Sequence, residues 1–194
     1  MTVFISLDVE ASGPVAGLYN LVSIGASAVR KTEGAWTIDP DDFYVELKPC
    51  FEGFSDEAMA IHGITREHLE KNGTEAKEAM QRLRDWSLAK LGAESGRPVF
   101  VGHNALFDWG YVNYYFVHTD VKNPYGYDGL DTKSLAMGAL NIPWKDCRKQ
   151  VLQKLLKLPE HDDDQAHRAD YDARYQAEIL RGLLTKLDER KKGG

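Results

Sequence analysis

The chain is poor in cysteine, and its two cysteines lie far apart. Cys50 and Cys147 are the only ones among 194 residues. This pattern fits neither a disulfide framework nor a metal site built from closely spaced cysteines. We therefore expect two free thiols and a cytoplasmic location.

Long apolar runs are also missing. No stretch approaches the ~20 apolar residues that span a bilayer, and no signal-peptide pattern opens the chain. The first residues, "MTVFISLDVE", instead place acidic residues directly after a short apolar run. This arrangement is typical of a buried strand, and we expect no membrane partner.

The sequence has no excess of positive charge. Its 30 acidic residues outnumber 24 Lys and Arg, giving a net charge of −6. Proteins that coat duplex nucleic acid usually carry a broad basic face, so such a footprint is not expected. An acidic protein can still bind nucleic acid where its negative charge is concentrated around metal ions.

Repeats, linkers and low-complexity segments are absent as well. A chain of 194 residues without them is most simply one domain, long enough to bury a sizeable core. We expect residues 1–194 to form that single domain, with a frayed basic tail from about residue 189.

The hydrophobic pattern indicates an α/β fold. A hairpin-like connection is expected at 31–40, because Gly34 and Pro40 interrupt the pattern there. Three early strands followed by alternating helices and strands predict a mixed sheet flanked by helices. The expected strands are 3–10, 20–30, 41–49, 97–104 and 127–132, and the expected helices include 76–86, 105–117, 149–158 and 169–190.

Acidic residues stand at the edges of three of these elements. Asp8 and Glu10 are two residues apart, so their side chains point the same way from the first strand. Asp108 follows the 97–104 strand, and residues 167–172 open the last helix. Taken singly, each has an ordinary explanation: a strand end that meets solvent, or acidic residues at a helix N-terminus.

Together, the three sites resemble the DEDDh family of 3′–5′ exonucleases. The matching segments are "DVEASG" (8–13), "HNALFD" (103–108) and "HRADYDA" (167–173). "LVSIGA", "IHGIT" and "LDT" agree in the same order along nearly the whole chain. The resemblance implies a ribonuclease H-like fold, with a mixed five-stranded sheet flanked by helices.

The resemblance also implies a two-metal site. Two divalent cations, Mg²⁺ or Mn²⁺, would activate water and stabilise the leaving oxygen, and carboxylates suit these ions. Asp8, Glu10 and Asp172 would hold one ion, and Asp8 and Asp108 the other. His167 would be the general base, since an imidazole accepts a proton near neutral pH.

The implied activity is 3′–5′ hydrolysis of single-stranded DNA or RNA ends, releasing nucleoside 5′-monophosphates. The first motif departs from the family, which usually has two threonines where this chain has Ala11 and Ser12. Candidate substrate-binding residues are Ala11, Ser12, Gly13, His62, Ile64 and Asn104. His62 and Ile64 are equally compatible with ordinary loop positions, and Asn104 with a cap of the following helix.

Other readings of the sequence remain open. The chain could be a catalytically silent nucleic-acid or protein-binding module, or a ribonuclease H-type endonuclease, although the latter lacks the His167 arrangement. Many relatives of the family are homodimers, so a homodimer is a further possibility. The basic run Lys145, Arg148, Lys149, Lys154 and Lys157 fits phosphate contacts or a solvated helix face.

Two aspartates compete for the last ligand position. Helical periodicity slightly favours burial of Asp170, whereas the spacing of the third motif favours Asp172. We choose Asp172 as the ligand and expect Asp170 to be a capping residue. Asp162 to Asp164 are expected to form a solvated loop beside the site, without a ligand role.

Overall fold

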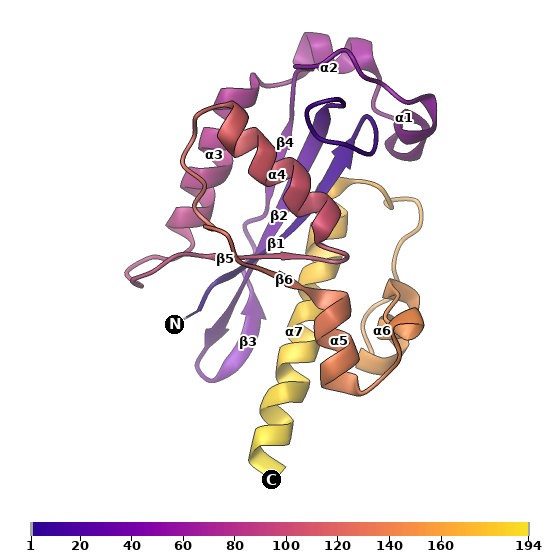
Figure 1. The fold of residues 1–194 in the computed structure, drawn as a ribbon. Coiled ribbons are helices and arrows are strands. Elements are labelled where there is room, and N and C mark those ends of the chain that lie inside the picture. Colours follow the sequence, from indigo (N-terminus) through magenta and orange to yellow (C-terminus); the bar gives the residue numbers. More distant parts are fainter. Residues whose placement is uncertain (1, 194) are drawn as a thin grey trace.

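The computed structural model describes residues 2–193, which form one mixed sheet between two groups of helices (Figure 1). The strands are β1 (Phe4–Ala11), β2 (Leu21–Thr32), β3 (Ala35–Ile38), β4 (Phe43–Glu46), β5 (Val99–Gly102) and β6 (Gly129–Asp131). They are ordered β3-β2-β1-β5-β6, and β4 also pairs with β2. β1 is antiparallel to β2 and parallel to β5, so it is the central strand.

The helices divide between the two faces of the sheet. They are α1 (Asp56–His62), α2 (Arg66–Asn72), α3 (Ala76–Ala89), α4 (Leu106–His118), α5 (Thr132–Leu140), α6 (Lys149–Leu156) and α7 (Ala169–Gly193), with a 3₁₀ turn at Trp144–Asp146. α3 and α4 cover one face, and α7 crosses the other, with α5 and α6 packed beside it (Figure 1). The predicted mixed sheet flanked by helices is confirmed.

The sheet has one strand more than the sequence predicted. The expected hairpin-like connection at 31–40 contains β3, which pairs with the end of β2. Glu33 and Gly34 both have positive φ, 50° and 85°, which matches the tight two-residue turn that a twisted hairpin favours. The turn is therefore short enough to leave Ala35–Ile38 free to pair.

Two short helices and the end of α7 also differ from the expectation. α1 and α2 begin after Ser55 and Thr65, whose side chains accept hydrogen bonds from the amides of Ala58 and His68. At the other end of the chain, α7 continues to Gly193 through residues that were expected to be frayed. Gly194 lies outside the described residues.

The side chains of β1 point alternately to the two faces of the sheet, so its apolar and acidic residues lie on opposite faces. Ile5, Leu7 and Val9 point into the main hydrophobic core under α3 and α4. Asp8 and Glu10 consequently point to the opposite face, toward α7. The close approach of that helix requires a small residue beneath it. A Cβ built on Gly25, which pairs with Asp8, would lie 2.0 Å from the carbonyl oxygen of Ala169.

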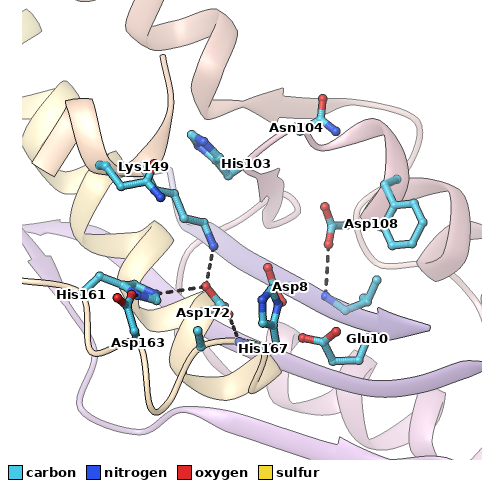
Figure 2. A pocket seen from close by; sticks show the side chains of 14 residues that line it. Asp8, Glu10, His103, Asn104, Asp108, Lys149, His161, Asp163, His167 and Asp172 are labelled. Atoms are coloured by element: carbon cyan, nitrogen blue, oxygen red, sulfur yellow. Dashed lines mark hydrogen bonds and ion pairs between the residues drawn. The ribbon is translucent and has the colours of Figure 1, made fainter. Parts of the chain in front are cut away.

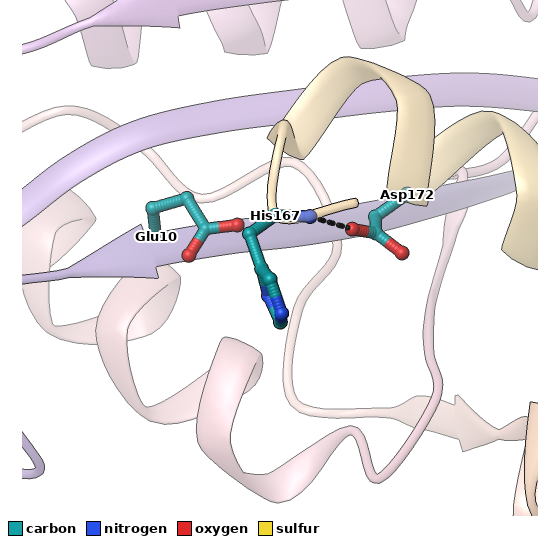
Figure 3. Close-up of side chains that lie close together, drawn as sticks. All are labelled: Glu10, His167 and Asp172. Atoms are coloured by element: carbon teal, nitrogen blue, oxygen red, sulfur yellow. Dashed lines mark hydrogen bonds between the residues drawn. The ribbon is translucent and has the colours of Figure 1, made fainter. Parts of the chain in front are cut away.

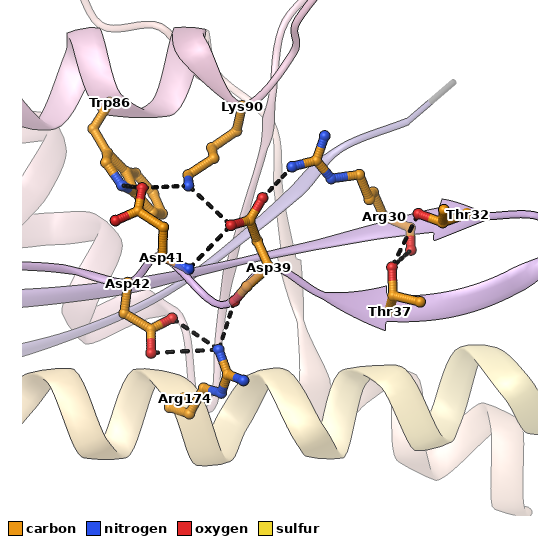
Figure 4. Close-up of polar contacts among 9 residues, drawn as sticks. All are labelled: Arg30, Thr32, Thr37, Asp39, Asp41, Asp42, Trp86, Lys90 and Arg174. Carbon is orange, nitrogen blue, oxygen red and sulfur yellow. Dashed lines mark hydrogen bonds and ion pairs between the residues drawn. The ribbon is translucent and has the colours of Figure 1, made fainter.

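A polar network fixes the first turns of α7 to the sheet (Figure 4). Lys90, at the end of α3, donates to Asp41 at 2.7 Å and to Asp39 at 3.2 Å. Arg174 of α7 donates to the carbonyl of Asp39 at 2.6 Å and to the carboxylate of Asp42 at 3.1 Å. The segment 39–42 thus joins α3, the sheet and α7. Its contact on α7, Arg174, stands two residues after Asp172.

The described helices include none that combines the length and the apolar character needed to cross a bilayer.

Candidate active site

Four carboxylates converge where β1, α4 and α7 meet (Figure 2). Asp8 and Glu10 come from the end of β1, Asp108 from the first turn of α4, and Asp172 from the first turn of α7. They line one cavity of about 420 Å³, together with His167. The five residues predicted as metal ligands and base are therefore brought together.

A hydrogen bond from β1 and the turn before α4 together position Asp108. Its Oδ1 accepts a hydrogen bond of 3.1 Å from the amide of Val9, between Asp8 and Glu10. The chain reaches α4 through a sharp turn at Asn104, whose φ is 70°, and Asp131 accepts from the amide of Ala105 at 2.8 Å. This turn aims the first turn of α4 at the end of β1.

Asp172 and His167 are joined at the start of α7 (Figure 3). The amide of His167 donates to Oδ2 of Asp172 at 2.9 Å. His167 has a φ of 63°, a left-handed conformation that is uncommon for a residue other than glycine and clusters at functional sites. Its side chain is exposed at the cavity, whereas Asp172 is buried.

The two aspartates at the start of α7 have different surroundings. Asp172 lines the cavity, whereas Asp170 pairs with Arg168 at 2.9 Å. The capping bond at this helix start is made by Asp172, through the amide of His167. No such bond to Asp170 occurs among the described residues, so the expectation that Asp170 is the capping residue was wrong.

Burial of several like charges raises the pKa of three of the carboxyl groups. Desolvation, followed by repulsion from Asp172 and Asp108, raises the pKa of Glu10 to about 8. Desolvation also raises the pKa of Asp108, to about 7, and, together with repulsion from Asp108, raises that of Asp8 well above its usual range. One nearby ammonium, that of Lys149, does not offset four carboxylates, and a bound cation would supply the missing positive charge.

The pKa of Asp172 is shifted in the opposite direction. Burial by itself would raise its pKa, but the ammonium of Lys149 and the amide of His167 lower it below the usual value. Nζ of Lys149 lies 2.5 Å from Oδ1 of Asp172, and Nε2 of His161 lies 3.5 Å from the same oxygen. Asp172 is therefore already organised as an anion.

The donor set suits a hard divalent cation. Ligand atoms of Glu10, His167 and Asp172 all lie within 4.8 Å of one another (Figure 3). The carboxylate of Glu10 has no hydrogen-bond partner among the described residues, so it is free to bind an ion. Carboxylate oxygens are the ligands that Mg²⁺ and Mn²⁺ prefer, and no cysteine lines the cavity.

A second cavity of about 510 Å³ adjoins the acidic one, with Val9, Glu10 and Phe107 common to both. Its lining includes Ala11, Gly13 and the exposed side chain of Ile61. It is more apolar than the first cavity, and Glu10 lines both. Two of the predicted substrate-binding residues, Ala11 and Gly13, therefore lie at a surface that a substrate could reach.

Ser12, by contrast, is engaged within the protein. Its hydroxyl donates to the carbonyl of Gly53 at 2.7 Å and accepts from the amide of Asn20 at 2.8 Å. Its own amide donates to the carbonyl of Asn20, and its carbonyl accepts from Ser55. These bonds shape the turn after β1.

Of the three remaining predicted substrate contacts, one lines the acidic cavity and two do not. Asn104 lines the acidic cavity, and its side chain does not cap α4. His62 and Ile64 line neither of the two adjoining cavities, and Ile64 faces separate hollows beside α2. Ile61, three residues before Ile64, lines the second cavity instead.

Sequence reasoning did not place at the carboxylates three residues that contact them, although Lys149 belongs to the basic run considered for phosphate contacts. Gln176 donates to Oδ1 of Asp8 at 2.5 Å, and its own oxygen accepts from the amide of His103 at 3.0 Å. Lys149 and His161 both face Asp172. Gln176 stands four residues after Asp172, hence on the same face of the helix, and this spacing could have revealed it. Lys149 and His161 come from separate segments, and spacing gives no signal for them.

Comparison with known proteins agrees with this geometry. The exonuclease family RNase_T matches residues 5–180. The 3′-5′ DNA exonuclease Cap18 of Escherichia coli is 38% identical over 190 residues, which cover 98% of this chain and 95% of that protein.

Solved structures share the fold at much lower identity. The nuclease domain of 3′hExo, a DEDDh family member bound to rAMP, superposes with a TM-score of 0.76 at 12% identity, covering 94% of this chain and 92% of that one. The zinc-bound E. coli ExoI–ssDNA complex gives a TM-score of 0.69 at 20% identity, covering 98% and 41%. The match along the chain, and the acidic site at the end of β1, lead to one assignment: the protein belongs to the RNase_T exonuclease family and is a 3′–5′ exonuclease of the DEDDh type.

Proposed function

We propose that the enzyme shortens single-stranded DNA from its 3′ end and releases nucleoside 5′-monophosphates. The observation that carries this proposal is the convergence of four carboxylates and His167 in one cavity, next to a second, more apolar one that shares Val9, Glu10 and Phe107 with it. The first cavity suits the scissile phosphate with its cations, and the second suits the terminal nucleoside.

Two divalent cations would be held by Asp8, Glu10, Asp108 and Asp172, with Asp8 shared between them. When bound, they would supply a hydroxide at neutral pH and neutralise charge on the phosphate and the leaving oxygen. The contribution of the protein is to keep the four carboxylates in place. The amide of Val9 donates a hydrogen bond to Asp108, and the side chain of Gln176 donates one to Asp8.

His167 is the proposed general base. Two imidazoles face Asp172, but their surroundings differ. The ring of His161 is enclosed by Tyr171 and Tyr175, with ring centroids 5.0 and 4.7 Å away. His167 is exposed to the cavity, and its backbone is held by Asp172. An exposed imidazole can take a proton from an attacking water and pass it to solvent.

DNA is the proposed substrate because the relative with 38% identity is named a DNA exonuclease. The cavity lined by Ala11, Gly13 and Phe107 would receive the terminal nucleoside, with Asn104 near the phosphate. Ala11 offers no side-chain hydroxyl to the sugar. We further propose that residues 1–194 act as one domain and that the enzyme works in the cytoplasm.

The test is a degradation assay with end-labelled single strands of DNA and RNA, in Mg²⁺ or Mn²⁺. We expect labelled mononucleotide from the 3′ end of DNA, with RNA cut more slowly and a circular strand left intact. Excess chelator and Asp8→Ala should each abolish release. Cleavage of the circle would indicate an endonuclease, and no release from any strand would indicate a silent binding module.

A further inference from the structure

Among the described residues, Lys149 has the only ammonium group that contacts one of the four carboxylates, that of Asp172. It is the first residue of α6, and its side chain extends across the acidic cavity to Asp172 (Figure 2). The packing of α6 on α5 and α7 holds it there. Leu152 of α6 is fully buried in the same cluster as Ile179 and Leu183 of α7.

The oxygen that Lys149 contacts is also a proposed metal ligand. Oδ2 of Asp172 already accepts from the amide of His167 at 2.9 Å, whereas Lys149 occupies Oδ1 at 2.5 Å. A cation that binds Oδ1 competes with the ammonium for this oxygen, because two positive charges on one oxygen repel each other. Lysine has three rotatable donors on a flexible stem, so its charge can remain in the cavity after displacement.

The charge of the site indicates where the ammonium would go. Four carboxylates carry four negative charges, which two divalent cations balance. Lys149 then leaves one positive charge, and the phosphodiester at a scissile position carries one negative charge. A lysine ammonium binds phosphate readily as a point charge.

We propose that Lys149 is a phosphate-binding residue that pairs with Asp172 in the metal-free enzyme and with the substrate phosphate once Asp172 binds a cation. This inference rests on the proposed function. Lys149 therefore links cation binding to phosphate binding, because the ammonium becomes available only when the carboxylate is occupied. The same residue competes weakly with the cation and holds the substrate.

Titration of the reaction product tests this role without turnover. The probes are deoxyadenosine 5′-monophosphate and deoxyadenosine, each titrated calorimetrically into Mn²⁺-loaded protein. Lys149→Met should weaken binding of the monophosphate about tenfold, the scale of one charge-assisted hydrogen bond, and leave binding of the nucleoside unchanged. Lys149→Arg should retain most of the affinity for the monophosphate.

Lys154→Met is the matched control, because Lys154 lies on the same helix, is exposed and does not line the cavity. It should leave both affinities unchanged. In excess chelator, Lys149→Met should have no effect on monophosphate binding, since Asp172 then retains the ammonium. Equal monophosphate binding by wild-type and Lys149→Met protein in Mn²⁺ would overturn the proposal.

A titration with Mn²⁺ alone separates this role from a structural one. Lys149→Met should bind Mn²⁺ at least as tightly as wild type, because a competing cation is gone. Weaker Mn²⁺ binding would show that Lys149 only shapes the site and would overturn the inference. Failure of the wild-type protein to bind either Mn²⁺ or the monophosphate would instead refute the proposed function, and this inference with it.

Discussion

Replacement of Glu10 by glutamine should stabilise the metal-free protein at pH 8 while it abolishes activity. The raised pKa of Glu10, about 8 against a usual 4.5, means that the folded state keeps a proton that the unfolded state releases. Folding stability therefore decreases as the pH rises between these two values. Glutamine has nearly the same shape, carries no charge and removes this cost.

The size of the effect follows from the shift. One pKa unit corresponds to about 1.4 kcal/mol, so a group with these two pKa values lowers the free energy of unfolding by about 3 kcal/mol between pH 5.5 and pH 8. In a domain of this size that is a fall in Tm of about 6–12 °C. Asp108, with a pKa of about 7, acts in the same direction. Asp172 acts in the opposite direction, but its lowered pKa places its effect below this window, in acid.

Thermal unfolding in chelator, followed by circular dichroism from pH 5.5 to pH 8, measures this dependence. Wild type should lose Tm across the range, and Glu10→Gln should lose less and be the more stable at pH 8. Glu67→Gln, on the exposed surface of α2, is the control and should follow wild type. Saturating Mn²⁺ should raise the Tm of wild type most at pH 8, where the carboxylates are ionised. A wild-type Tm that stays level or rises with pH in chelator would contradict a raised pKa for Glu10 in the folded protein.

Four further substitutions have defined outcomes. Asp172→Asn should abolish nucleotide release and Asp170→Asn should largely preserve it, as measured with end-labelled DNA; equal losses would contradict the assignment of Asp172. Gln176→Met should lower the affinity for Mn²⁺ by about tenfold in calorimetry, because Asp8 loses the amide that orients it; unchanged affinity would mean that this contact is dispensable. Gly25→Ala should destabilise the fold by about 1–3 kcal/mol in urea unfolding and reduce activity as well, because the added methyl group meets the backbone of Ala169; a variant of wild-type stability would show that α7 does not pack as tightly as described.

The sequence predicted the sheet and its flanking helices because hydrophobic periodicity reports burial directly. The spacing of Asp8 and Glu10 placed both side chains on one face of a strand, as the structure has them. The strand β3 was missed because its four residues alternate too briefly to be distinguished from a connection. α1 and α2 are one to two turns long, and only their caps, Ser55 and Thr65, signal them.

The acidic site was predictable and its neighbours were not, for a physical reason. Motif spacing identifies residues that share a strand or a helix turn. Lys149 and His161 meet Asp172 only because α6 and the segment after it fold back over the start of α7. Helical phase slightly favoured burial of Asp170, but the side chain of Asp170 pairs with Arg168 and does not line the cavity. The close approach of α7 to β2 at Gly25, together with the contacts of Arg174 and Gln176, orients the face of the helix that reaches the carboxylates.

The union of β1 and α7 makes the site a property of the whole chain. Asp8 and Asp172 are more than 160 positions apart in the sequence, and neither element alone provides a place for an ion. During synthesis, a nascent chain would hold Asp8, Glu10 and Asp108 long before Asp172 leaves the ribosome, so the proposed cation site would be incomplete. A partly unfolded molecule in which α7 has separated from the sheet would lack Asp172 at the site in the same way. Hydrogen exchange at the first turn of α7, with and without Mn²⁺, would reveal this coupling between completion of the fold and the capacity to cut.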